Sequence, residues 1–126
     1  FYLVLKEPLT AGVAYRLRLH AGERSFRYAP GSTEHEAIHI NQIGYRADDP
    51  FKRAFLSLWL GSGGGWKLHA REFEIVEEAG GRVVYRGMIE AGFPASRHED
   101  FRPARNYVGT DVHYLDFHDF RQEGTF

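Results

Sequence analysis

The feature that most constrains the fold of this chain is a two-residue alternation of apolar and polar side chains, which recurs in short runs. In residues 13–19 every second side chain is apolar. This period is typical of a half-buried β-strand, because successive side chains of a strand point to opposite faces of the sheet. Similar runs recur about every ten residues with glycine or proline turns between them, and aromatic residues make up 15% of the chain. The pattern therefore predicts an all-β fold, a β-sandwich rather than an α/β protein.

The apolar runs place the expected strands at residues 1–5, 13–19, 26–28, 38–41, 53–60, 73–77, 83–87 and 112–117. Residues 53–60 form the most apolar run, so Trp59 is expected to pack in the core. Residues 90–106 show little periodicity and are expected to be mostly loop. The glycine-rich segment 61–65 is not followed by the Gly-Lys-Ser/Thr and helix of a phosphate loop, so a flexible hairpin connection is expected there.

A break at residues 29–32, Ala-Pro-Gly-Ser, predicts a domain boundary. Residues 1–31 are expected to be the C-terminal strands of an upstream β-module, and residues 32–126 a second β-domain. Both ends of the chain read as the middle of a strand, and a strand without its neighbours leaves backbone hydrogen-bonding groups unpaired. We therefore expect a window cut from a longer polypeptide, with the second domain truncated before its last strand.

Charge and composition exclude several classes of function. The 16 Lys and Arg residues balance 17 Asp and Glu residues to give a formal charge of -1, without the basic face of a nucleic-acid-binding protein. The absence of cysteine excludes disulfide scaffolds, Cys-ligated zinc and thiol nucleophiles. Because no apolar run approaches 18 residues, no membrane-spanning segment is expected.

Residues 35–39, His-Glu-Ala-Ile-His, match the H-E-x-x-H motif of zinc proteases. On a helix the two imidazoles would share one face and bind zinc, with Glu36 as general base. Gln42 and Tyr45 stand where the longer metzincin motif requires Gly and His, and a β-rich stretch follows at once. A chance match is the better interpretation, and neither a metal nor a cofactor is predicted.

Other titratable and aromatic residues also cluster in the sequence, but most favour a structural interpretation. Residues 98–100 and 113–119 gather acids and histidines, and paired carboxylates can hydrolyse glycosides, but nothing in the sequence brings two of them into one cleft, so no catalytic residue is predicted. The aspartates at 48, 49, 111 and 119 lack the spacing of a calcium loop, and solvated turns are the better interpretation. Among the aromatic residues Tyr2, Trp59, Trp66 and Tyr107, the candidates for carbohydrate contact are Trp66 and Tyr107.

Residues 38–55, IHINQIGYRADDPFKRAF, closely resemble the opening of the immunoglobulin-like (Ig-like) domain that precedes the catalytic module of family 9 glycoside hydrolases. Three further segments match that domain in order, at residues 73–76, 81–87 and 114–120, the last ahead of Gly-Thr-Phe at 124–126. His118 and Glu123 depart from the family pattern, in which Ser and Pro stand. The resemblance covers about 90 residues, from near 37 to the end.

The resemblance implies an Ig-like β-sandwich that packs against an (α/α)6 catalytic barrel in the same parent chain and stabilises it. The barrel would carry the paired carboxylates for inverting hydrolysis of β-glucans. Its Asp-Ala-Gly-Asp motif is absent from these 126 residues, so this segment is expected to be non-catalytic and its parent an endoglucanase-like hydrolase. The family also implies an extracellular or periplasmic location.

The motif residues make physical sense as architecture. Asn41 and Gly44 suit a bend, through side-chain bonds to the backbone and a free φ respectively. Tyr45 offers an apolar ring with a hydroxyl for a buried partner, and Asp116 is expected to accept backbone N–H bonds. The expected structural residues are Asn41, Gln42, Gly44, Tyr45, Asp116 and Phe117.

A second hypothesis is a stand-alone carbohydrate-binding or adhesive β-sandwich. Trp66, Tyr107 and the loop at 90–106 would then form an exposed platform for a polysaccharide. Fold alone does not distinguish the two hypotheses.

Overall fold

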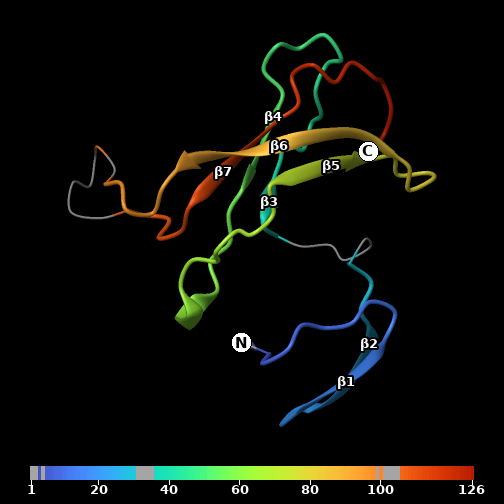
Figure 1. The fold of residues 1–126 in the computed structure, drawn as a ribbon, viewed down its shortest axis with the longest axis vertical. Coiled ribbons are helices and arrows are strands. Elements are labelled where there is room, and N and C mark those ends of the chain that lie inside the picture. The colour runs from blue at the N-terminus through green and yellow to red at the C-terminus, as the bar shows by residue number, and fades with distance from the viewer. Residues whose placement is uncertain (1–2, 4, 31–35, 99, 101–105) are drawn as a thin grey trace. The chain divides into compact units, whose positions relative to one another are not determined.

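The computed structural model describes residues 3, 5–30, 36–98, 100 and 106–126 (Figure 1). Contacts divide the chain into two compact units, Phe1–His35 and Glu36–Phe126, which we call the hairpin unit and the sheet unit. The described residues contain strands, turns and short 3-10 turns but no α-helix, and none of them forms a helix long and apolar enough to cross a membrane. The all-β prediction is confirmed.

The hairpin unit contains two antiparallel strands, β1 (Ala14–Leu19) and β2 (Gly22–Arg27). The rings of Tyr15 and Phe26, which face each other across the pair, stack with centroids 5.8 Å apart. No residue of either strand is buried. In the segment predicted as a first strand, the two described residues, Leu3 and Leu5, are exposed and outside any strand.

The sheet unit contains five antiparallel strands in the order β3-β4-β7-β6-β5. Their bounds are β3 (Ile38–His39), β4 (Arg53–Leu56), β5 (Glu72–Val76), β6 (Val83–Phe93) and β7 (Val112–Asp116). The first half of β6 pairs with β5 and the second half with β7, so this long strand joins the two parts of the sheet (Figure 1).

The second half of β6 corrects the prediction that a loop begins at residue 90. The strand continues to Phe93, with Ala91 opposite His113 and Phe93 opposite Val112. The pairing register shifts at Gly92, and this irregularity breaks the alternation that sequence reasoning relies on. A Cβ atom at Gly92 would lie 2.5 Å from the ring of Tyr114, so the close approach requires glycine.

The prediction for Trp59 is also wrong, because β4 ends at Leu56 and not at residue 60. Trp59 forms an isolated bridge with Gly65 across the 3-10 turn η2 (Gly61–Gly63), and 49% of its surface is exposed. Its ring packs over Gly109, where a Cβ would come within 3.0 Å of it. Once the chain leaves the sheet, the alternation no longer assigns side chains to a buried face.

The core lies on one face of β4 and β7. Its buried members are Ala37, Ala54, Leu56, Leu115 and Phe117. Half-buried residues of β5, β6 and the connections pack against them, namely Tyr45, Leu58, Trp66, Leu68, Phe73, Ile75, Tyr85, Ile89 and Phe120. Strand alternation leaves Arg53, Phe55, Tyr114 and Asp116 on the opposite face, since they occupy the intervening positions.

Candidate functional site

The segment that leads into β4 bends at the motif predicted from sequence. The side chain of Asn41 accepts a hydrogen bond from the N–H of Ile43 (2.9 Å) and donates one to the carbonyl oxygen of Gly44 (3.2 Å). Gly44 has φ 84°, a left-handed conformation that glycine adopts without steric cost. The neighbouring Gln42 is exposed. Local hydrogen bonds therefore set the shape of this bend.

Tyr45 connects the bend to the sheet. Its hydroxyl donates to the carbonyl oxygen of Arg53 (2.6 Å), and its ring meets that of Phe117 edge-on with centroids 5.2 Å apart. The half-buried ring contributes to the core while its hydroxyl has a backbone partner. Tyr45 and Phe117 thus hold the start of β4 against the end of β7.

Arg53 and Asp116 face each other across β4 and β7 and form a two-pronged ion pair. Arg53 Nε lies 3.1 Å from Asp116 Oδ1, and Nη2 lies 2.5 Å from Oδ2. The guanidinium also lies 4.3 Å from the ring centroid of Tyr114. The hydrogen bond from Arg53 to Asp116 is the main cause that raises the pKa of Arg53 above its ordinary value. The carboxylate of Asp116 therefore accepts hydrogen bonds from the side-chain N–H groups of Arg53, whereas the sequence predicts backbone N–H donors.

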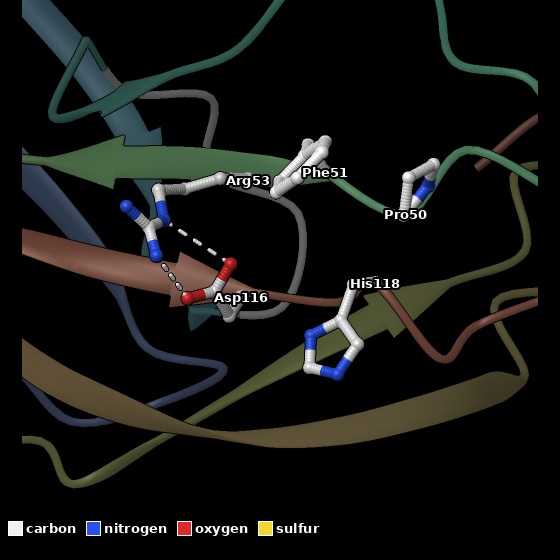
Figure 2. Close-up of a pocket in the computed structure, with 5 residues that line it drawn as sticks. All are labelled: Pro50, Phe51, Arg53, Asp116 and His118. Atoms are coloured by element: carbon white, nitrogen blue, oxygen red, sulfur yellow. Dashed lines mark hydrogen bonds and ion pairs between the residues drawn. The ribbon is translucent and has the colours of Figure 1, made fainter.

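This ion pair forms one side of a hollow of ≈ 570 Å³ (Figure 2). The hollow is lined by Pro50, Phe51, Arg53, Asp116 and His118. Pro50 and Phe51 precede β4 and His118 follows β7, so the strand pairing brings together residues far apart in the sequence. The pairing of β4 with β7 creates the hollow, which we call the Arg53 hollow.

Phe51 projects from backbone that is fixed on both sides, although 85% of its own surface is exposed. Its N–H donates to Asp49 Oδ1 (2.8 Å). The next residue, Lys52, is buried; its Nζ donates to the carbonyl oxygen of Ala47 (2.7 Å), and its own carbonyl oxygen accepts the N–H of Phe117 (3.0 Å). Sequence reasoning missed Phe51, whose only signal was a large apolar residue directly after an Asp-Asp-Pro turn.

Two acids that flank β7, Asp119 after its end and Asp111 before its start, have partners of their own. The hydroxyl of Tyr85 donates to Asp119 Oδ1 (2.7 Å). Burial and this bond raise the pKa of Tyr85 to about 12, and the same bond lowers the pKa of Asp119. Asp111 accepts the N–H of Ala95 (2.8 Å), which lowers the pKa of Asp111.

This arrangement does not resemble a hydrolytic centre. The Arg53 hollow contains one carboxylate, which is already bound to a guanidinium, whereas glycoside hydrolysis uses two. Across the part of the chain that the structure describes, no three His, Asp or Glu side chains gather in a way that would hold a metal ion.

An apolar groove of ≈ 730 Å³ lies elsewhere on the sheet unit. Its lining includes the core residues Ala54, Leu115 and Phe117. Large hydrophobic side chains at its rim are exposed, namely Ile38, Ile40, Val76 and Phe126. The residues at the C-terminal end lie beside β5, where the carbonyl oxygen of Thr125 accepts the N–H of Glu78 (3.1 Å). We call this the β3–β5 groove.

A family model described as the cellulase N-terminal Ig-like domain matches residues 33–126. The chain belongs to this family. The match confirms the resemblance and, with the all-β structure, the predicted Ig-like β-sandwich class. Comparison with curated proteins and comparison with solved structures find no match. From here the sheet unit, residues 36–126, is called the Ig-like domain.

The structure gives the two predicted carbohydrate residues of the Ig-like domain different surroundings. Trp66 is half-buried and packs against the core, and its backbone N–H donates to the carbonyl oxygen of Leu58 (2.9 Å). Tyr107 is exposed. Tyr2 and most of the segment at 99–105 lie outside the described residues, so the predicted platform is seen only in part.

The second half of the H-E-x-x-H match lies in the Ig-like domain as a turn and a strand. His35 is outside the described residues, Ala37 is buried, and Ile38–His39 forms β3. Zinc binding by this motif needs both histidines on one face of a helix. The extended backbone at His39 is incompatible with that spacing.

Proposed function

We propose that this chain is a non-catalytic part of a larger family 9-like glycoside hydrolase, and that its Ig-like domain packs on the catalytic (α/α)6 barrel and stabilises it. The parent would hydrolyse β-glucan such as cellulose, outside the cell or in the periplasm. The description of the matched family as an N-terminal domain of cellulases supports this assignment.

The observation that carries the packing role is the β3–β5 groove. Ile38 and Ile40 are each 54% exposed at its rim, and core side chains line its interior. Exposed apolar surface that is continuous with a core is a common mark of an interface. Covering it would contribute roughly 25 cal/mol for each Å² of apolar surface removed from water. The proposed occupant is the catalytic domain of the same parent chain.

Two substitutions in the full-length parent test this role. Ile40→Asp puts a charge at the rim of the groove and is expected to lower the melting temperature of the catalytic domain by several degrees in scanning calorimetry, since burying an unpaired charge is costly. The matched control is Ile43→Asp, because Ile43 is 95% exposed and lies outside the groove lining. Equal melting temperatures for Ile40→Asp and the unmodified parent would contradict the proposal.

We also propose that residues 1–31 are the last strands of an upstream β-module. The two-stranded hairpin buries none of its own strand residues, and isolated two-stranded hairpins are marginally stable at best in water. Limited proteolysis of the parent, read by mass spectrometry, should then cut between the hairpin and residue 36. A further strand of the Ig-like domain after Phe126 stays a prediction from the sequence.

A further inference from the structure

The Arg53 hollow has the properties of a ligand site that the packing role does not use. Its volume of ≈ 570 Å³ falls within the roughly 300–1,000 Å³ that is typical of small-molecule sites. None of its five lining residues lines the β3–β5 groove. A ligand in the hollow and a domain in the groove would therefore contact different residues.

Phe51 offers the hollow an exposed aromatic ring on a backbone that hydrogen bonds hold in place. Its ring is exposed, and hydrogen bonds hold the backbone at Asp49, Lys52 and Phe117 around it. A ligand that stacks on this ring would not have to order the loop first, and the entropy cost of binding is lower for such a preformed surface. A flat ligand face made of C–H groups fits an aromatic face of this kind.

The polar side of the hollow is charged but balanced. Arg53 uses two of its roughly five N–H donors on Asp116, and the carboxylate uses two of its roughly four lone-pair positions. The side chains of Arg53 and Asp116 are 41% and 24% exposed, so the remaining donors and acceptors can be reached. His118, which is exposed and is one of the lining residues drawn in Figure 2, adds an imidazole that can donate or accept.

These groups select the chemistry of the ligand. A phosphate or a metal ion would meet a guanidinium and a carboxylate that already neutralise each other. A purely apolar ligand would cover the charged pair without bonding to it, which is unfavourable. A pyranose ring has both an apolar C–H face and hydroxyls at its edge that donate and accept.

We propose that the Arg53 hollow binds a neutral carbohydrate chain, with one sugar ring stacked on Phe51 and its hydroxyls bonded to Asp116, Arg53 and His118. The choice of a β-glucan as the probe rests on the proposed function. The two proposals are tested by different measurements. The packing role is read from the melting temperature of the parent, and the carbohydrate site from NMR shifts of the 126-residue chain.

The test is an NMR titration of the isotope-labelled 126-residue chain with cellohexaose. Backbone amide signals of residues 51–53 and 116–118 should shift along a saturable curve, and Phe51→Ala should weaken binding at least tenfold. Ile43→Ala is the matched control, since it removes a similarly exposed apolar side chain from the same connection between β3 and β4, and it should bind as the unmodified chain does. His118→Ala should weaken binding by a smaller factor.

Three results would overturn this site. The first is the absence of any saturable shift up to the solubility limit of cellohexaose. The second is a set of shifts centred on Trp66 and Tyr107 that Phe51→Ala leaves unchanged, which would place the sugar on the other platform. The third is a response of the hollow to inorganic phosphate but not to cellohexaose, which would make it an anion site.

Discussion

The hairpin unit and the Ig-like domain are built from the same alternating pattern but use it differently. β1 and β2 pair over their full length, yet every one of their residues is exposed or only half-buried. In β4 and β7 the same alternation gives buried residues, because half-buried side chains of β5 and β6 pack against them. Alternation therefore makes a strand, whereas burial needs further side chains packed over one of its faces.

Ion pairs show the same contrast. In the hairpin unit Glu23 lies 3.0 Å from both Arg16 and Arg18, and all three side chains are at least 42% exposed. In the Ig-like domain the Arg53–Asp116 pair is more sheltered and has two aligned hydrogen bonds. Exposed pairs contribute little, since water and salt screen them.

The largest expected effect comes from truncating the core. Leu115, a core residue of β7, is 2% exposed, and Leu115→Ala should lower the free energy of unfolding of the Ig-like domain by about 2–5 kcal/mol. Leu17→Ala in β1 should change the same transition by less than about 0.5 kcal/mol, because Leu17 is not buried. Urea unfolding followed by tryptophan fluorescence measures both, as both tryptophans lie in the Ig-like domain. An equal loss of unfolding free energy in Leu115→Ala and Leu17→Ala would mean that the hairpin unit contributes to the core of the Ig-like domain.

The next effect concerns close packing between β5 and β6. A Cβ atom at Gly87 would lie 2.4 Å from the ring of Phe73, so Gly87→Ala should cost about 1–3 kcal/mol as the ring is displaced. Gly80→Ala, in the turn between these strands, meets only the end of a flexible glutamate at 3.4 Å and is the control. The measurement is the same urea unfolding. If Gly87→Ala unfolds with the same free energy as the control, the ring of Phe73 in β5 can move away from β6 without a loss of stability.

A pair of double-mutant cycles compares the two ion pairs directly. The coupling free energy between Arg53 and Asp116, from Arg53→Met and Asp116→Asn, should be about 1 kcal/mol. The coupling between Arg18 and Glu23 should be at most about 0.3 kcal/mol. Raising the salt concentration should weaken the second pair more than the first. A larger coupling in the hairpin would show that greater exposure does not weaken an ion pair in this protein.

The smallest effect is a dependence of stability on pH. The pKa of Tyr85 is raised to about 12 from its ordinary value of 10.0, so the folded state holds the phenol proton more tightly than the unfolded state. This contribution is complete below pH 10 and is lost as the pH rises toward 12. The lowered pKa of Asp119 has the opposite pH dependence. Its contribution to the stability of the folded state is present above pH 3.8 and is lost as the pH falls below that value. Tyr85→Phe should reduce both dependences in unfolding curves recorded across these ranges, and unchanged curves would exclude the bond.

Several local features could be predicted because neighbours in the sequence create them. The bend at Asn41 and Gly44 forms through side-chain and backbone groups within four residues, and Tyr45 has the partnered hydroxyl that its chemistry requires. The strands expected at 13–19, 73–77 and 112–117 lie close to β1, β5 and β7. By contrast, the extension of β6 to Phe93 could not be predicted, since the register shift at Gly92 breaks the period.

The alternation and the motif at 38–55 were enough to predict an all-β chain and its resemblance to the Ig-like family, which the structure and the family match confirm. Which residues meet was decided by strand pairing. Arg53 and Asp116 are 63 positions apart and become partners because β4 lies beside β7, and the same pairing brings His118 to the hollow beside Phe51. Periodicity specifies which face of a strand is apolar, but long-range register alone sets which side chains share a site.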